Sequence, residues 1–334
     1  MSSGGPRRGA GDRVRIGVLG AAGQIGRCLV REIEAGADLE LAFGVTRAEL
    51  DLVDPASIEP WLSRPGIVRP DVVVNAAGFT KVDACETQPT LAHQLNARVP
   101  GEWARSLQQR GIRFLHLSTD YVFSGDGRRP YREGDGTSPR CVYGESKRAG
   151  ERLVLGHDPS ALVVRTSWIF GPGRNFVLAI LEQAAERRRQ ESPMPLRVVD
   201  DQLGSPTAAA DLAEALVALC RRLVGEGSDL RGLLHLCNTG VTSWFGFARA
   251  ILDQAGYADV AIDPVATGVF ETAAPRPAYS VLDCSRALSL GIQLRPWTEA
   301  LAGYLAGPDR PTHLLAASSA SIPDPAPVRR KVSH

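Results

Sequence analysis

A net charge of either sign is what this sequence most clearly lacks. Its 38 lysine and arginine residues are balanced by 37 aspartate and glutamate residues, which leaves a formal net charge of +1. A nearly neutral chain offers no strongly basic surface to nucleic acid or to an anionic membrane. We therefore expect neither of them as a partner.

Cysteine and histidine are also scarce, and neither is clustered. The six cysteines form no Cys-x-x-Cys pair and the six histidines show no metal-ligand spacing, so the sequence predicts neither a zinc site nor a disulfide framework. Isolated cysteines are typical of small buried residues in a reducing compartment. No apolar run approaches the roughly 20 residues of a membrane helix, and residues 1–12 lack the apolar segment of a signal peptide. We expect a cytoplasmic protein.

What the chain does have is enough apolar material for one large core or two modest ones, since 44% of its 334 residues are hydrophobic. The two ends of the chain differ from the rest in amino-acid composition. Residues 1–12 are rich in serine, glycine, proline and arginine, and residues 307–334 in proline, serine and alanine. We expect both ends to be disordered tails.

A glycine-rich turn follows the first apolar run. Residues 14–19 are predicted to form a strand, and glycine then recurs at positions 20, 23 and 26 before a helix-like segment at 27–35. Glycine lets the backbone turn tightly and approach a pyrophosphate, whose charge is stabilised at the N-terminus of the helix. G-x-x-G-x-x-G is a variant of the usual spacing, but its place after the first strand predicts a dinucleotide-binding site.

The end of the second predicted strand, residues 39–45, bears on the choice of cofactor. NAD-binding folds usually offer an acidic residue there to the ribose 2′-hydroxyl, whereas this chain has Arg47. A cation favours a 2′-phosphate, so we expect NADPH, with NADH as the alternative. The other interpretation is that Arg47 is simply a solvated side chain. Asp51 either contacts the adenine or caps the next turn.

Further apolar runs at 71–75, 113–117 and 162–165 alternate with helical segments, among them 91–109. This alternation predicts an α/β protein with a Rossmann-like, doubly wound parallel sheet and ligands at the carboxyl ends of its strands. Small residues at 76–78 follow the third strand, and they leave room for a cofactor to pass close to the backbone.

Tyr143 and Lys147 lie four residues apart in a predicted helix and therefore share one face. A free tyrosine holds its proton up to a pH of about 10, and a nearby ammonium lowers that pKa because it favours the phenolate. A ketone oxygen between Tyr143 and a hydroxyl from the preceding strand end, Ser118 or Thr119, would be polarised by two hydrogen bonds. Such Tyr/Lys pairs also arise by chance, so other motifs must support this interpretation.

Several motifs together carry a resemblance to a known family. GxxGQIG, VVVNAAG, STDYVFSG and YGESK resemble an extended short-chain dehydrogenase/reductase. With RTSWIFG at 165–171, DDQLGSPT at 200–207 and RPAYSVLDCSRA at 276–287, the chain is similar over roughly residues 14–304 to the dTDP-4-dehydrorhamnose reductase family. The longer motifs are the more specific ones.

The resemblance implies a set of site residues. The catalytic hydroxyl, acid and lysine correspond to Thr119, Tyr143 and Lys147. Residues implied for the cofactor are Gly20, Gly23, Gln24, Ile25 and Gly26 around its pyrophosphate, and Asn75, Ala76 and Ala77 along its nicotinamide half, with Tyr143 and Lys147 also in contact. Residues implied for the substrate are Thr80, Val82, Thr119, Asp120, Trp168 and Arg174.

Two of these implied roles have an alternative, and so has the placement of a further residue, Asn96, near the site. Trp168 offers a flat apolar ring to the face of a deoxysugar, or else is an ordinary core tryptophan. Arg174 meets a phosphate, or is simply exposed. Asn96 lies near the active site, or makes a local bond to the backbone of its own helix.

The resemblance also implies an architecture and an activity. An NAD(P)-binding domain at 13–172, completed by parts of 204–240, is expected beside a smaller C-terminal substrate-binding lobe at 173–203 and 241–306. The implied reaction is NADPH-dependent reduction of the C4 ketone of dTDP-4-dehydro-6-deoxy-L-mannose to dTDP-L-rhamnose, with Tyr143 as proton donor. The alternatives are a 4-ketoreductase for another dTDP-deoxysugar and a non-catalytic, NADP-binding regulatory subunit of the methionine adenosyltransferase type. We expect a monomer or a homodimer.

One position departs from the family pattern. Some members dimerise around Mg²⁺ held partly by a glutamate two residues after the last glycine of the turn, where this chain has Cys28. A thiol is a poor ligand for a hard cation. Although Asp200 and Asp201 offer carboxylates elsewhere, we predict no metal.

Overall fold

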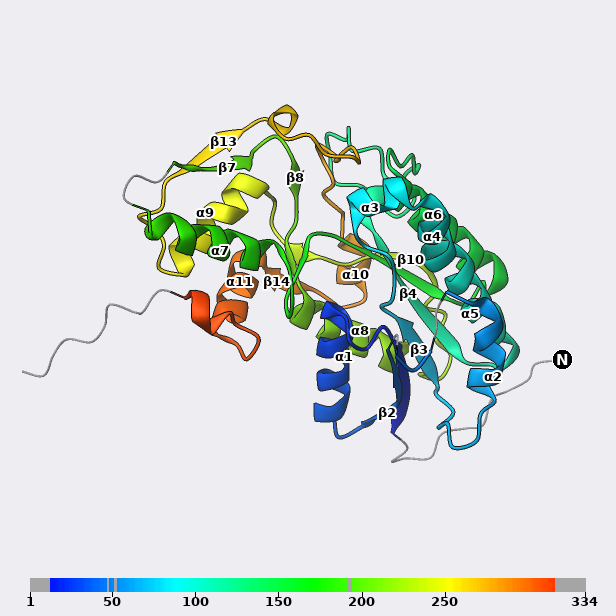
Figure 1. Ribbon diagram of the computed structural model, residues 1–334. Coiled ribbons are helices and arrows are strands. Elements are labelled where there is room, and N and C mark those ends of the chain that lie inside the picture. The colour runs from blue at the N-terminus through cyan, green and yellow to red at the C-terminus, as the bar shows by residue number, and fades with distance from the viewer. Residues whose placement is uncertain (1–12, 47, 51–52, 191–193, 316–334) are drawn as a thin grey trace, which may run out of the picture.

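A six-stranded parallel sheet lies at the centre of the computed structural model, which describes residues 13–46, 48–50, 53–190 and 194–315. The strand order is β10-β5-β4-β3-β1-β2 (Figure 1). Its strands are β1 (Val14–Leu19), β2 (Leu39–Val45), β3 (Val72–Asn75), β4 (Arg113–Thr119), β5 (Leu162–Thr166) and β10 (Gly232–His235). The predicted fold class, an α/β doubly wound parallel sheet, is confirmed.

Helices cover both faces of the sheet, which explains why its strands are continuous apolar runs. On one face α1 packs against α8, and on the other α5 packs against α6 (Figure 1). Successive strand residues serve opposite faces: Val72 and Val74 belong to the core under α1 and α8, and Val73 to the core under α5. These helices are α1 (Gln24–Ala35), α2 (Ile58–Leu62), α5 (Val99–Gln109), α6 (Val142–His157) and α8 (Ala209–Leu223).

The helix predicted over 91–109 is divided in the structure. It consists of α4 (Pro89–His93), a π-helical turn η2 (Gln94–Arg98) and α5. A π turn inserts an extra residue into the helix and commonly occurs at functional sites. Here it carries the buried amide of Asn96, whose partners are described below.

A smaller lobe lies beside the sheet (Figure 1). Its core is built around Phe247, which is fully buried. It contains α7 (Phe176–Arg188), α9 (Trp244–Gln254) and α11 (Trp297–Ala306), with a parallel pair formed by β7 (Leu196–Val199) and β13 (Ile262–Val265). The division of the chain into domains at the predicted boundaries stays a prediction.

Short elements connect the sheet with the smaller lobe. The strands are β6 (Ile169–Phe170), β8 (Leu203–Gly204), β9 (Thr207–Ala208), β11 (Asn238–Thr239), β12 (Thr242–Ser243) and β14 (Leu294–Pro296). The helical turns are η1 (Pro55–Ser57), α3 (Val82–Thr87), η3 (Asp120–Val122), η4 (Thr267–Val269), α10 (Ser285–Ser289) and η5 (Thr312–Leu314). In the part of the chain that the structure describes, no helix has both the length and the apolar character to cross a membrane.

The strand order places a crevice at the carboxyl edge of the sheet. The chain passes from β1 to β2 on one side and then returns to β3 on the other side of β1. Connections at such a reversal leave in opposite directions and open a space for a ligand. The turn after β1 is the glycine turn.

Candidate active site

A cavity of about 1160 Å³ opens at this edge, between the sheet and the smaller lobe. Most of the predicted site residues line it. These are Gly20, Gly23, Gln24, Ile25, Asn75, Ala76, Ala77, Thr80, Val82, Thr119, Asp120, Tyr143, Lys147, Trp168 and Arg174. Gly26 does not line the cavity, and Arg47 and Asp51 lie outside the described residues.

The glycine turn has a shape that larger residues would not allow. Gly20 has a φ of 80°, in the left-handed region. A Cβ atom on Gly26 would lie 2.1 Å from the carbonyl oxygen of Gly20, so the turn itself requires glycine here, and contact between Gly26 and the cofactor stays a prediction. Gly23 caps α1 without a side-chain hydrogen bond, so the first backbone amides of the helix are directed at the cavity. Such a cradle fits a diphosphate.

A second turn, after β3, is fixed by buried amides. Oδ1 of Asn75 accepts a hydrogen bond from the backbone N–H of Ala77 at 3.0 Å, and the amide nitrogen of Asn75 lies 3.1 Å from Nδ1 of His116 on β4. His116 is fully buried, and burial together with the charge of Lys147 lowers its pKa, so its ring is neutral. These bonds therefore hold the turn, with the small side chains of Ala76 and Ala77, in place beside the glycine turn.

Tyr143 and Lys147 face the cavity from the first two turns of α6. The helix begins at Cys141, whose Sγ accepts a hydrogen bond from the N–H of Gly144, while Glu86 accepts one from the N–H of Val142 at 2.8 Å. The ammonium group of Lys147 donates to the carbonyl oxygen of Leu117 at 2.6 Å. The helix is thus held against β4 at the level where that strand ends.

The pKa of Tyr143 differs from the sequence-based expectation. Burial raises it above its ordinary value, while a hydrogen bond with Thr119 lowers it. The charge of Asp120 also raises it, and the Lys147 ammonium is bonded to the β4 backbone. Burial lowers the pKa of Lys147 itself to about 8, and the charge of Glu151 opposes that effect. Tyr143 therefore holds its proton at neutral pH.

The structure distinguishes the two candidate hydroxyls. Ser118 donates to Oε1 of Glu151 at 2.6 Å, away from the tyrosine, whereas Thr119 is close enough to Tyr143 to lower the pKa of its phenol. The Thr119 hydroxyl also lies 2.9 Å from Oδ1 of Asp120. Thr119 is thus the hydroxyl that adjoins Tyr143.

Asp120 is a buried carboxyl group at the cavity wall. Burial raises its pKa to about 6, although the hydrogen bond with Thr119 lowers it. Its Oδ2 atom has no hydrogen-bond partner among the described residues, and neither has the hydroxyl of Thr166 on the neighbouring strand. Buried polar atoms are nearly always paired in folded proteins. Both residues line the cavity, although the hydroxyl of Ser280 also adjoins the Asp120 carboxyl group and lowers its pKa.

Asn96 makes long-range bonds, not a local one. Its side-chain oxygen accepts from the N–H of Phe79 at 2.7 Å, and its nitrogen donates to the carbonyl oxygen of Phe79 and to the hydroxyl of Ser146, each at 3.0 Å. A Cβ atom on Gly150 would lie 2.0 Å from the carbonyl oxygen of Asn96, so α6 passes close to the π turn. Asn96 thereby joins the loop after β3 to the catalytic helix.

Two site residues on the substrate side depend on the smaller lobe. Trp168 lines the cavity with its ring stacked on Trp244. Trp244 was not predicted as a site residue, because it lies far from Trp168 in the sequence and belongs to none of the motifs. Arg174 lines the cavity next to α7, and its carbonyl oxygen accepts a hydrogen bond from Gln24 at 3.1 Å. This bond links the glycine turn to the smaller lobe.

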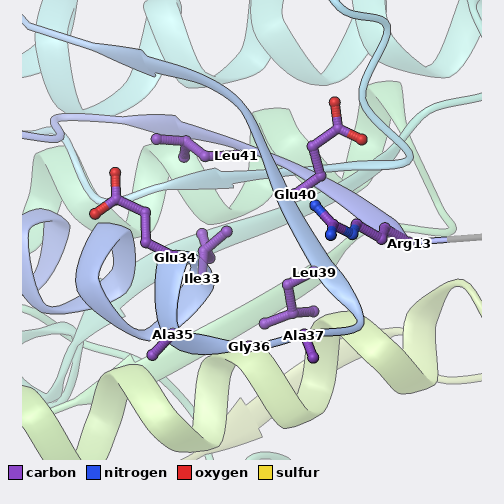
Figure 2. A pocket seen from close by; sticks show the side chains of 9 residues that line it. All are labelled: Arg13, Ile33, Glu34, Ala35, Gly36, Ala37, Leu39, Glu40 and Leu41. Atoms are coloured by element: carbon purple, nitrogen blue, oxygen red, sulfur yellow. The ribbon is translucent and has the colours of Figure 1, made fainter.

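Two further features, a pair of aspartates and a second hollow, lie outside the cavity lining. Asp200 accepts a hydrogen bond from Ser243 and Asp201 from Thr267, and the described residues contain no cluster of three or more metal-ligating side chains. A shallow hollow of about 310 Å³ lies between the end of α1 and the start of β2, with Arg13, Glu34 and Glu40 around it (Figure 2). It lies at the opposite edge of the sheet from the cavity.

The fold and the cavity together define a Rossmann-type dinucleotide-binding protein of the reductase class. Residues 14–308 match the family model described as RmlD substrate binding domain. The chain belongs to this family.

Named relatives are similar over most of their length. The chain is 40% identical to a dTDP-4-dehydrorhamnose reductase of Mycobacterium tuberculosis, over 91% of this chain and 97% of the relative. It is 38% identical to a probable dTDP-4,6-dihydroxy-2-methyloxan-3-one 4-ketoreductase of Streptomyces antibioticus, over 85% of this chain and 92% of the relative. The crystal structure of dTDP-4-dehydrorhamnose reductase from Bacillus anthracis in complex with NADP superposes with a TM-score of 0.78 at 32% identity, and the match covers 88% of this chain and 99% of that one.

Proposed function

We propose that this protein catalyses the NADPH-dependent reduction of the C4 ketone of dTDP-4-dehydro-6-deoxy-L-mannose to dTDP-L-rhamnose. The observation that carries the proposal is the meeting of Thr119, Tyr143 and Lys147 at one end of a cavity whose other end is the glycine turn. The names of the relatives supply the substrate class, and the relative that holds NADP supports the cofactor.

The residues around the cavity suit this cofactor in two places. The glycine turn and the N-terminus of α1 would hold its diphosphate, and the turn at Asn75, Ala76 and Ala77 would lie along its nicotinamide half. When bound, NADPH supplies the hydride that reaches C4 of the sugar. The expected preference for NADPH over NADH rests on Arg47, which follows β2 in the sequence, and Arg47→Asp is expected to weaken the binding of NADPH more than that of NADH.

Tyr143 acts as the proton donor. Because burial keeps its phenol protonated at neutral pH, it carries the proton that the ketone oxygen needs as it becomes a hydroxyl. Thr119 donates a second hydrogen bond to the same oxygen and fixes its position. An ammonium near the phenol would stabilise the phenolate that forms as the proton leaves, so Lys147 is proposed to favour the transfer.

Substrate contacts surround this centre. The ionised carboxylate of Asp120 accepts hydrogen bonds from sugar hydroxyls, and Thr80, Val82 and Trp168 shape the remaining wall. Arg174 is placed to meet the diphosphate of the sugar nucleotide. A ketone held between Tyr143 and Thr119 would then face the nicotinamide half of the cofactor.

The test is turnover of dTDP-4-dehydro-L-rhamnose generated in situ, followed by the loss of NADPH absorbance, with the product identified by mass spectrometry and NMR. Formation of dTDP-L-rhamnose supports the proposal. The relative from Streptomyces antibioticus favours a second candidate, the reduction of another dTDP-4-ketosugar. NADPH binding without turnover of the rhamnose precursor, together with turnover of a different ketosugar, would replace the first candidate with the second.

A further inference from the structure

Two tryptophans from distant parts of the chain are stacked face to face at the cavity. Trp168 follows β5 and Trp244 begins α9. Their ring centroids are 3.6 Å apart and their planes differ by 4°. Both residues line the cavity, and both are only partly buried. The pair therefore joins the sheet to the smaller lobe at a point that a ligand reaches.

Trp168 has an unusual backbone conformation. Among the described residues other than glycine, it alone has a positive φ, 48°. Bulky residues rarely adopt this left-handed conformation, which persists only where the surroundings enforce it. The carbonyl oxygen of Trp168 accepts a hydrogen bond from the N–H of Thr207 at 3.1 Å, and a Cβ atom on Gly204 would lie 2.4 Å from Cε2 of its ring. The ring fits because Gly204 has no side chain.

Trp244 is held more firmly than its partner. Its indole N–H donates to Oε1 of the buried Gln202 at 3.1 Å, and the Gln202 amide donates in turn to the hydroxyl of Thr267 at 3.0 Å. Asp201 accepts a hydrogen bond from the N–H of Thr267 at 2.9 Å. The Phe176 ring packs on Trp244 with centroids 4.6 Å apart. These contacts hold the Trp244 ring in one orientation, and the Trp168 ring stacks on it.

The position of the pair identifies the part of the ligand that it meets. Thr119 is the register partner of Thr166, and Trp168 comes two residues later on the same strand end. In the sheet, β3 and β4 separate β5 from β1 and its glycine turn. The tryptophan pair consequently lies beside Thr119 and Asp120, where the reacting sugar is proposed to bind, and away from the diphosphate end of the cofactor.

We propose that Trp244 is a specificity-determining residue: it positions the Trp168 ring in its left-handed conformation, so that the stacked pair forms a rigid apolar wall for the sugar ring of a 6-deoxyhexose nucleotide. Carbon-bound hydrogens and a methyl group pack well on a flat indole surface, whereas a hydroxymethyl group gains less from it. The inference rests on the proposed function and extends it from the reacting ketone to the recognition of the sugar.

Kinetics of three variants test this role. Trp244→Leu removes the stack and is expected to raise KM for dTDP-4-dehydro-L-rhamnose roughly tenfold with kcat little changed, since ring stacking has about that value in affinity. Trp244→Phe keeps an aromatic ring but loses the bond to Gln202, and an intermediate KM is expected. Trp297→Phe is the matched control, because Trp297 is a partly buried tryptophan of the same lobe outside the cavity lining. Its KM is expected to remain that of the wild type.

Binding and spectroscopy separate this inference from the proposed reaction, because neither requires turnover. Trp244→Leu is expected to weaken dTDP-L-rhamnose roughly tenfold and to leave dTDP and NADPH unchanged. A stacked indole pair couples in circular dichroism, and that signal should disappear in Trp244→Leu and in Trp168→Phe but persist in Trp297→Phe. Equal weakening of dTDP and dTDP-L-rhamnose, or unchanged binding in a folded Trp244→Leu, would overturn the inference. Failure of the wild type to reduce the ketosugar would instead reject the proposed function.

Discussion

Tyr143 is a protonated phenol in this structure, and that state suits the direction of the proposed reaction. Burial raises its pKa, and the neighbouring charge of Asp120 acts in the same direction. An acid that keeps its proton until a ketone oxygen becomes basic is ready to donate at neutral pH. Lys147 is then proposed to stabilise the phenolate that forms as Tyr143 gives up its proton.

Tyr143→Phe removes the proton and leaves the ring. We expect turnover to fall by about 10² or more, while the dissociation constant of NADPH, measured by fluorescence titration, changes little. Because Tyr121 packs edge-on against Tyr143 with centroids 5.5 Å apart, Tyr121→Phe is a matched control that should keep most of the activity. An unchanged rate in Tyr143→Phe would remove Tyr143 from the mechanism.

Asp120 should make the protein less stable as the pH rises. Its pKa is about 6 in the folded state against 3.8 ordinarily, so the folded state binds the proton more tightly. Its contribution to stability is complete below pH 3.8 and is lost as the pH rises through 6. At pH 7 the ionised form therefore costs about 3 kcal/mol of unfolding free energy.

Asp120→Asn is expected to be more stable than the wild type at pH 7 by up to about 3 kcal/mol, and nearly equal to it at pH 4, because Asn cannot ionise. Urea denaturation at both pH values measures the difference. Asp263→Asn, at an exposed residue on β13, is the matched control for the loss of one carboxyl group. A constant difference between Asp120→Asn and the wild type across this range would contradict the account.

At the scale of elements, α6 is held by a buried ion pair. Glu151, one turn beyond Lys147, bonds Nε of Arg165 on β5 at 2.8 Å and Nη2 at 2.7 Å, and it also accepts the Ser118 hydroxyl from β4. The side chains of the pair are only 2% and 6% exposed. These bonds of Glu151 thereby fix the position of α6 against β4 and β5.

Glu151→Gln would leave the Arg165 guanidinium buried without its counter-charge. We expect a loss of about 3–5 kcal/mol in unfolding free energy, measured by urea denaturation, and a double variant, Glu151→Leu with Arg165→Met, should recover most of it. Glu145→Gln removes a charge from the exposed face of the same helix and should have little effect. If Glu151→Gln is as stable as the wild type, the ion pair does not hold α6.

Local sequence patterns predicted the strands and helices whose formation depends mainly on neighbouring residues. The strands of the sheet are buried on both faces, so their apolar runs were unambiguous, and the spacing of Tyr143 and Lys147 specified a helix face. The helix at 91–109 was predicted without its π turn, because that turn depends on bonds from Asn96 to Phe79, which a helical pattern does not contain.

Local sequence patterns could not predict contacts between distant parts of the chain. Trp168 and Trp244 meet only once the smaller lobe has folded beside the sheet. The pKa of Tyr143 is raised where the helix spacing led us to expect a lowered one, because spacing says nothing of burial, and the effect of Lys147 on this pKa stays a prediction.

At the scale of the whole molecule, the cavity lies where the sheet and the smaller lobe meet. The hydrogen bond from Gln24 to Arg174 joins the two parts at the cavity, and an ion pair between Arg31 on α1 and Asp309, at 2.8 Å, joins them outside the cavity lining. A ligand that contacts both lobes should therefore stabilise the whole chain against unfolding.

NADPH at a hundred times its dissociation constant should raise the free energy of unfolding by about 2.7 kcal/mol, because only the folded chain forms the glycine turn and the turn at Asn75. Thermal denaturation with and without NADPH measures this. NADH at the same concentration should raise the midpoint less if Arg47 contacts a 2′-phosphate. Equal shifts with the two dinucleotides would show that the charge at the end of β2 is not used.

The most direct measurement of the central claim follows one hydrogen atom. NADPH carrying deuterium at its transferable position is incubated with the protein and dTDP-4-dehydro-L-rhamnose, and the product is examined by NMR. The account predicts dTDP-L-rhamnose with deuterium at C4. A product without deuterium at C4, or no product from a protein that binds NADPH, would contradict it.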